Sequence, residues 1–259
     1  MSIDVNPDWW KFLFDDVYLL TDARSVCNET LTRREVDVIC ELLPIDLNQR
    51  ILDLCGGHGR HSFELCRRGY TSCTLLDYSK TLIDKARSNA GEYNYPLETI
   101  RCDARKTDLP SNSFNHVLIM GNSIGYIQEP DADMKILSEA HRLLQTAGWL
   151  LVDVTDGTVI KNSFNPSAWH EIGDDTIVCR QRELQGEVIC ARELVVSKQE
   201  GLIRDQTYSI RLYTPDRLAE LLVQVGFRQV KVHTDFSPHQ SDGDYGFMNH
   251  RMLAVGQKN

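Results

Sequence analysis

The chain has 259 residues, 42% hydrophobic and 25% charged, which is the composition of a globular protein and argues against a disordered chain. Lysine and arginine total 28 against 37 aspartates and glutamates. The resulting net charge of −9 disfavours nucleic acid or an anionic membrane surface as the main partner. No apolar run is long enough to span a bilayer and no secretory signal is visible, so we expect a cytoplasmic protein. The eight cysteines complete no metal-ligand set, and we expect reduced thiols and no metal site.

The first 155 residues begin with two predicted helices and continue with predicted strands that alternate with helices. Residues 8–20 and 30–43 carry apolar side chains at helical spacing and predict two helices, the second stopped by Pro44. Strands are then predicted at 50–54, 72–77, 97–102, 114–120 and 149–155, and helices at 60–68, 79–90 and 132–144. This alternation is typical of an α/β fold with a doubly wound, mostly parallel sheet and helices on both faces.

The pattern breaks after Asp156. Segments 176–184, 187–197 and 202–213 alternate with period 2 between glycines, which predicts an antiparallel β-meander within 167–212 and no helix there. A helix is predicted from Thr214 to Gly226, and strands at 227–233 and 250–257 follow. The fold class is therefore a Rossmann-like α/β sheet with an antiparallel insertion after its fifth strand.

The first predicted strand ends in a glycine-rich loop, Asp53-Leu-Cys55-Gly56-Gly57-His58-Gly59. Glycines let the backbone approach a ligand closely, and the following helix offers free N–H groups. A dinucleotide-binding loop would need a third glycine where Ser62 stands. A dinucleotide would also bring its pyrophosphate close to the Asp53 carboxylate, so a cationic ligand is favoured.

Two further acids follow the next strands. Asp77 ends the second strand, where a carboxylate can accept hydrogen bonds from both hydroxyls of a ribose. Asp103 follows the third strand and could accept one from an adenine amino group. Each acid alone is also explained as a surface residue or a helix cap. Three acids at successive strand ends, beside the loop, favour a cationic ligand that contains a nucleoside.

These residues resemble the class I S-adenosylmethionine-dependent methyltransferases of the small-molecule type. The resemblance covers about residues 45–155 and rests on the segments ILDLCGGHG, LLDYS, CDARKTDLP, FNHVLIMGNSIGYI and AGWLLVDV in this order. It implies a seven-stranded sheet whose last strand is antiparallel. It also implies S-adenosylmethionine as cofactor and methyl transfer by direct displacement.

The resemblance also implies a cofactor site. The loop would pass under the methionine part, Asp77 would hold the ribose, and Tyr78 would pack on the adenine. The full implied set is Tyr18, Asp53, Cys55, Gly56, Gly57, Asp77, Tyr78, Asp103, Ala104, Met120 and Gly121. The chain departs from the family at Cys55, which replaces the usual first glycine and favours a negative φ there.

The acceptor site is less constrained by the sequence. Asn122 and Tyr126 follow the fourth strand and should face the acceptor. The proline motif of nucleic-acid N-methyltransferases and a Pro-Cys nucleophile are both missing, which favours a small molecule methylated at O or N. In the meander, we expect Trp169, Arg211 and Tyr213 to contact it, although ordinary solvated residues would give the same pattern.

His239, in the predicted loop 234–249, is a candidate general base, with a plain loop histidine as the alternative. We expect one domain, 1–259, with an N-terminal helical cap at 1–44 and a β-meander lid at 156–212. Two other functions stay open: a cofactor-binding protein without turnover, and an RNA or protein methyltransferase. The acceptor and the oligomeric state cannot be read from the sequence.

Overall fold

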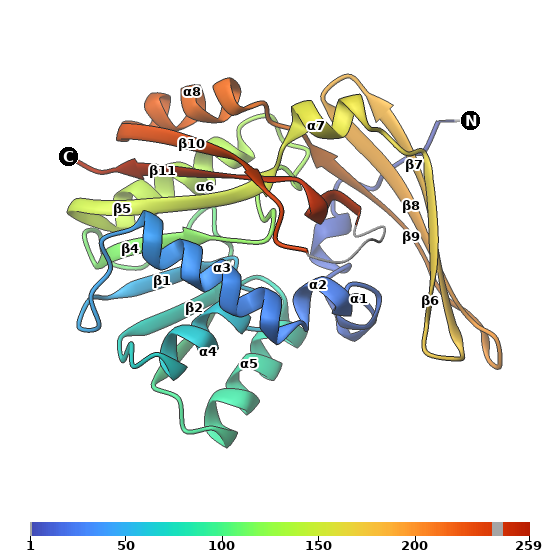
Figure 1. Cartoon of the computed structure of the whole chain (residues 1–259), viewed down its shortest axis with the longest axis horizontal. Coiled ribbons are helices and arrows are strands. Elements are labelled where there is room, and N and C mark those ends of the chain that lie inside the picture. The colour runs from blue at the N-terminus through green and yellow to red at the C-terminus, as the bar shows by residue number, and fades with distance from the viewer. Residues whose placement is uncertain (1, 240–245) are drawn as a thin grey trace.

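The computed structural model describes residues 2–239 and 246–259, and its main feature is a seven-stranded sheet (Figure 1). The strand order is β10-β11-β5-β4-β1-β2-β3. The strands are β1 (Ile51–Leu54), β2 (Cys73–Asp77), β3 (Leu97–Arg101), β4 (Phe114–Ile119), β5 (Leu144–Thr155), β10 (Arg228–Phe236) and β11 (Arg251–Gln257). Strand β11 is antiparallel to both of its neighbours, and the other described pairs in this sheet are parallel. The predicted fold class and the antiparallel last strand are confirmed.

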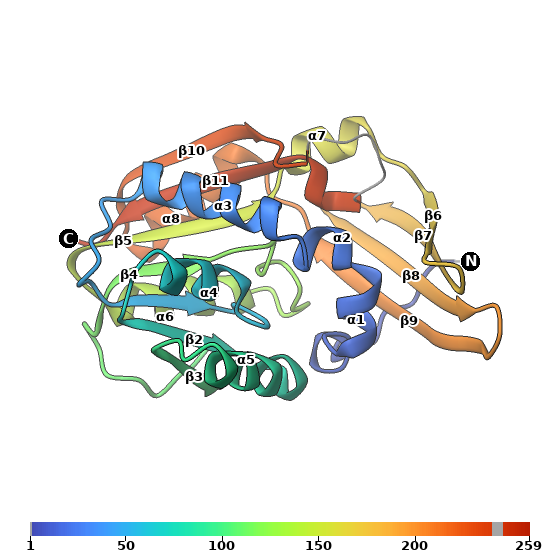
Figure 2. The same ribbon diagram turned by 60° about the horizontal axis from the view of Figure 1, so that its bottom comes forward.

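Helices cover both faces of this sheet, as the alternation along β5 shows. Leu150 and Val152 point into a core shared with α6 (Ala132–Leu143) and α8 (Pro215–Val225). Leu151, between them, points to the opposite core, which includes residues of α3 (Glu29–Leu42) and α4 (Arg60–Arg67). Figure 2 shows α3 and α4 on one side, with α5 (Lys80–Glu92) beside β2 and β3. Two apolar layers thus hold the strand ends in fixed positions.

Most helix boundaries follow from local capping, as predicted. Ser79 accepts a hydrogen bond from the Leu82 N–H and begins α5. Thr214 caps α8, which ends at Gly226 with φ 115°, a conformation that favours glycine. Among the described residues, no helix is long and apolar enough to cross a membrane.

The N-terminal segment is not the single helix that was predicted over 8–20. It forms a 3₁₀ turn, η1 (Trp9–Lys11), then α1 (Asp16–Thr21) and α2 (Ala23–Val26). Asp15 starts α1 by accepting a hydrogen bond from the Tyr18 N–H at 3.0 Å, which interrupts the helix. Because of this break, Trp9 packs on the antiparallel sheet described next, while Trp10 packs on Tyr78 with ring centroids 4.7 Å apart.

The second sheet is an antiparallel meander in the order β6-β7-β8-β9. Its strands are β6 (Ser167–Ile172), β7 (Thr176–Gln185), β8 (Val188–Ser197) and β9 (Gly201–Arg211), of which β6 was not predicted as a strand. A short helix, α7 (Gly157–Asn162), precedes it and was also missed. In Figures 1 and 2 this sheet stands beyond the carboxyl ends of β1 and β4, with α1 beside it. The carboxyl ends of the parallel strands therefore face the meander.

Candidate active site

The glycine-rich loop leaves β1 in a conformation with several positive φ angles. Cys55 has φ 63°, Gly57 60° and Gly59 86°. The expectation of a negative φ at Cys55 is therefore wrong: the loop keeps its left-handed turn although the side chain is not glycine. At Gly56, a Cβ would lie 2.3 Å from Leu75 Cδ1 and 2.6 Å from Asp53 Oδ2. The backbone at this point thus packs closely on its neighbours.

Asp53 lies beneath the loop and not in a cavity. Its side chain is buried, Oδ2 accepts a hydrogen bond from Ser62 Oγ at 2.8 Å, and no described residue bonds to Oδ1. Burial raises the pKa of this carboxyl group. Asp53 is not among the residues that line the two cavities described next, so the cavity lining does not support the predicted direct contact with a cationic ligand.

A first cavity, here called the strand-end cavity, lies over β1, β2 and the chain after β3. Its lining is Trp10, Phe14, Tyr18, Cys55, Gly57, Asp77, Tyr78, Ser79, Leu82, Asp103, Ala104, Gly121, Ser123, Tyr126, Ile127, Asp133 and Ile136. Asp77 accepts hydrogen bonds from the N–H groups of Gly57 and Ser79, both at 2.8 Å. Burial raises the pKa of Asp77 to about 6. Each carboxylate oxygen keeps a lone pair for a ligand hydroxyl.

The far end of the strand-end cavity is built from stacked and paired side chains. Asp103 binds Arg105 through both carboxylate oxygens, with Arg105 Nη2 2.7 Å from Oδ2. Arg105 lies over the ring of Trp10, 5.3 Å from its centroid, and Trp10 contacts Tyr78. Although burial would raise the pKa of Asp103, the bonds from Arg105 hold that pKa below its usual value. Asp103 is ionised at neutral pH and already shared with a cation.

A second cavity, here called the meander cavity, continues from the first. The two share Phe14, Tyr18, Cys55, Gly57, Gly121, Ser123 and Tyr126. The meander cavity is also lined by Trp9, Leu13, Asp22, Ser25, Val26, Gly56, His58, Arg60, His61, Met120, Asn122, Arg180, Arg182, Glu193, Arg204, Tyr208, Ile210 and Met248. Two ligand parts can thus meet where the cavities join.

The loop after β4 provides polar groups at this junction. Asn122 has φ 63° and accepts a hydrogen bond from the Thr155 N–H at 2.9 Å. Burial raises the pKa of Tyr126 despite a hydrogen bond from the Asn122 side chain, and burial also raises that of Tyr18. Both phenols therefore keep their protons at neutral pH, so they can donate hydrogen bonds.

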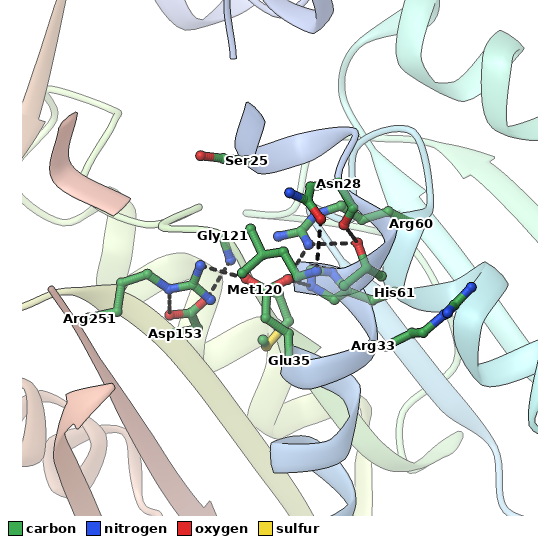
Figure 3. A network of polar contacts seen from close by, with 12 residues as sticks. Ser25, Asn28, Arg33, Glu35, Arg60, His61, Met120, Gly121, Asp153 and Arg251 are labelled. Atoms are coloured by element: carbon green, nitrogen blue, oxygen red, sulfur yellow. Dashed lines mark hydrogen bonds and ion pairs between the residues drawn. The ribbon is translucent and has the colours of Figure 1, made fainter. Parts of the chain in front are cut away.

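A buried network of ion pairs supports the floor of the junction (Figure 3). The Gly121 N–H donates to Asp153 Oδ2 at 2.8 Å, and Asp153 pairs with Arg251. Arg251 Nη1 lies 2.6 Å from Glu35 Oε1, and Glu35 also pairs with Arg60 and His61, two residues that begin α4. Burial alone would raise the pKa of Glu35, but Arg60 and Arg251 hold it well below its usual value.

Sequence reasoning missed this network because charged residues on a helix and at a strand end usually face solvent. The available signal was Arg251, which opens the otherwise apolar run MLAV of β11. Its consequence is rigidity: the network joins α3, α4, β5 and β11 to the backbone of Gly121.

Three residues predicted for the acceptor site do not line either of these cavities. Trp169 is 68% exposed on β6. Arg211 and Tyr213 do point together, but both bind Asp133 at the start of α6. The reason is that β9 ends at Arg211, whose N–H donates to the Gly125 carbonyl at 2.8 Å, and the chain then leaves toward α8. The residues of the meander that do reach the cavity are Arg180, Arg182, Glu193, Arg204, Tyr208 and Ile210, at alternate strand positions.

His239 is also not among the residues lining these cavities. Its Nε2 lies 3.4 Å from Ser25 Oγ, beside α2. Burial lowers its pKa to about 4, so the imidazole is neutral at pH 7. Residues 240–245 of the predicted loop 234–249, including Tyr245, lie outside the described residues.

Comparison with known proteins gives a consistent family. A family model described as "Methyltransferase domain" matches residues 51–148. A putative methyltransferase YqeM from Bacillus subtilis is 24% identical over 240 residues, which are 90% of this chain and 95% of that protein. A glycine/sarcosine N-methyltransferase from Aphanothece halophytica is 24% identical over 201 residues, covering 76% of this chain and 74% of that protein.

Among solved structures, an S-adenosylmethionine-dependent methyltransferase from Clostridium acetobutylicum has the same fold. The TM-score is 0.74 at 13% identity, over 94% of this chain and 97% of that chain. Three features fit S-adenosylmethionine as cofactor. They are the glycine loop with its positive φ angles, the buried Asp77 carboxylate that accepts the Gly57 N–H, and the seven-stranded sheet with an antiparallel last strand. The match to the methyltransferase domain over residues 51–148, together with these relatives and the fold, supports a class I S-adenosylmethionine-dependent methyltransferase.

Proposed function

We propose that this methyltransferase transfers a methyl group to oxygen or nitrogen of a small molecule bound in the meander cavity. One observation carries the proposal. The meander cavity is lined by three parts of the chain: the loops that follow β1 and β4, the N-terminal segment through Trp9 and Phe14, and the inner face of the meander through Tyr208. Residues 9–26, within the cap expected at 1–44, and the meander, within the lid expected at 156–212, therefore border the acceptor. A cavity bounded on these sides suits a small acceptor better than an RNA or protein surface.

The cofactor residues divide by position. Residues 55–57 and Gly121 would border the methionine part, Asp77 would accept hydrogen bonds from the ribose hydroxyls, and Tyr78 with Asp103 and Ala104 would border the adenine. When bound, S-adenosylmethionine supplies an electrophilic methyl group on a sulfonium centre. The chain orients the acceptor in line with it and excludes water.

The junction favours positioning over proton abstraction. Tyr18 and Tyr126 stay protonated there, and burial lowers the pKa of His58 to about 4. A neutral amine needs no base before it attacks the methyl group, so this lining serves nitrogen directly. The name of the Aphanothece halophytica relative, a glycine/sarcosine N-methyltransferase, is consistent with a small amine.

The test is a labelling experiment with a trideuteromethyl donor. The enzyme is incubated separately with a low-molecular-weight cell extract, with total RNA and with total protein, and each pool is analysed by mass spectrometry. We expect label in the small-molecule pool, on oxygen or nitrogen in fragment spectra. Label confined to RNA or protein, or label on carbon, would overturn the proposal. The Asp77→Ala variant, in which S-adenosylhomocysteine binding should weaken, is the cofactor control.

A further inference from the structure

Two buried side-chain nitrogens, in residues that line the meander cavity, make no hydrogen bond to any described residue. Arg204 on β9 is 8% exposed; its Nη2 pairs with Asp15, but Nη1 makes no hydrogen bond and lies 3.7 Å from Glu193 Oε1. The indole Nε1 of Trp9, a residue only 1% exposed, is likewise without a hydrogen bond. A buried donor left unsatisfied is costly and rare.

Both donors belong to the same wall of the cavity. Trp9 packs on Tyr208, with ring centroids 5.7 Å apart. Tyr208 and Arg204 are four residues apart on β9 and therefore share one face of the meander. The Trp9 ring also lies 5.4 Å from the ring of Tyr126, centroid to centroid, so aromatic rings pack around the indole donor. A ligand that fills this wall therefore needs acceptor oxygens at one end and an apolar or flat part beside them.

The charge of the lining indicates the sign of that end. Four guanidinium groups line the cavity against two carboxylates: Arg60, Arg180, Arg182 and Arg204 against Asp22 and Glu193. Arg180 pairs with both of these acids. Burial raises the pKa of Glu193, which disfavours its charged form. Arg60 is paired with Glu35 and Arg204 Nη2 with Asp15, so the four cations face four acids in all, and the preference for an anion rests on the Arg204 Nη1 group that makes no hydrogen bond.

We propose that the acceptor carries a carboxylate, bound by Arg204 Nη1 and by the indole N–H of Trp9. The inference rests on the proposed function, because it describes the acceptor of the same cavity. Two donors match the two oxygens of a carboxylate, whereas a phosphate would leave acceptor sites unmatched in a buried wall. The reacting nitrogen or oxygen then lies on the side of the molecule nearest Gly121 and Ser123, where the cavities join.

The first experiment determines the chemistry of the labelled product. The product made from the low-molecular-weight extract with the trideuteromethyl donor is passed over an anion exchanger, before and after carbodiimide coupling to an amine and after phosphatase treatment. We expect retention that carbodiimide coupling abolishes and phosphatase leaves unchanged. Loss of retention with phosphatase, or no retention at all, would overturn the carboxylate while leaving the proposed function intact. Absence of any labelled small molecule would overturn both.

The second experiment asks whether these two residues bind the carboxylate. Arg204→Gln should raise the acceptor KM about 10- to 100-fold, and Trp9→Phe, which keeps the ring and removes the N–H, several-fold. The Kd of S-adenosylhomocysteine, measured by calorimetry, should change by less than about 3-fold. The matched control is Arg192→Gln, on the outer face of the same sheet, where Arg192 pairs with Asp205.

The outcomes separate binding from folding. A purely structural role would lower kcat and cofactor affinity together, or raise the KM for the carboxylate and for its amide equally. In Arg204→Gln we expect the preference for the carboxylate acceptor over its primary amide to disappear. An unchanged preference, or the same loss in Arg192→Gln, would overturn the proposal.

Discussion

Cys55 occupies a backbone conformation that the family usually assigns to glycine. Its φ of 63° costs an L-residue roughly 1–2 kcal/mol, while glycine gains unfolded-state entropy. Cys55→Gly should therefore leave the free energy of unfolding unchanged or raise it by up to about 1 kcal/mol. Cys55→Val, which is β-branched, should lower it by about 1–3 kcal/mol. Equilibrium urea unfolding measures both, and a destabilised glycine variant would contradict this account.

Asp77 should make cofactor binding depend on pH. Burial raises the pKa of Asp77 to about 6, and in the proposed cofactor site the ionised form would accept hydrogen bonds from the ribose hydroxyls. As the pH falls through about 6 the carboxylate gains a proton, so the Kd of S-adenosylhomocysteine should rise by at most tenfold per pH unit. Above that pH the Kd should be constant.

The control for this pH effect is Asp77→Ala, whose weaker binding should show no step near pH 6. Calorimetry at several pH values would measure both proteins. A step that persists without the carboxylate would assign the titration to another group.

At the scale of elements, the buried network of Figure 3 predicts a large stability effect. Arg251 stands between Asp153 and Glu35, and all three are fully buried. Arg251→Met should lower the free energy of unfolding by about 3–5 kcal/mol, because the buried Asp153 loses its cation and the buried Glu35 keeps only Arg60. The exposed pair of Arg217 with Glu220 is the control, and Arg217→Met should cost less than about 1 kcal/mol. A loss at Arg251 no larger than at Arg217 would show that the network adds no stability.

The elements also show what the sequence can and cannot reveal. The α/β alternation, the caps at Ser79 and Thr214 and the period of the meander are local patterns, and the structure agrees with them. The break at Asp15 and the short α7 were missed, because a six-residue helix contains too few turns for a clear period. Of the residues that the resemblance implies for the cofactor, most line the strand-end cavity, Gly56 and Met120 line the meander cavity, and Asp53 lies beneath the loop.

The acceptor side was harder to predict for a different reason. Alternation along a strand tells which residues share a face but not where the strand ends over the cavity. Arg180 and Arg182 share a face and reach the cavity, whereas Arg211 and Tyr213 share a face and bind Asp133. Strand alternation therefore predicts correctly which residues share a face in both pairs, but it does not predict that only Arg180 and Arg182 reach the cavity.

At the scale of the whole molecule, the N-terminal segment contributes residues to both cavities. Trp10, Phe14 and Tyr18 line the strand-end cavity, and pairs of Asp15 with Arg204 and of Asp22 with Arg180 attach the segment to the meander. S-adenosylhomocysteine should therefore slow amide hydrogen exchange over residues 9–22, because ligand binding favours the closed state.

The comparison region for this exchange experiment is α8, which lines neither of the two cavities. Mass spectrometry of peptic peptides, with and without the ligand, would measure both regions. Equal protection in both would indicate general stabilisation, and none at residues 9–22 would contradict closure.

The meander enters and leaves the fold at one point. Asp156 is bridged to Tyr213, and the Gly157 N–H donates to the Tyr213 carbonyl at 2.9 Å. The two ends of the insertion are in contact, and the entropic cost of closing a loop grows only slowly with its length. The inserted segment can therefore differ in length at a small cost in stability. Under the proposed function, residues 158–212 select the acceptor, and we expect this segment to be exchangeable without a change in the strands of the main sheet. Replacing 158–212 by another hairpin array would alter which molecule is methylated while the methyl source stays the same.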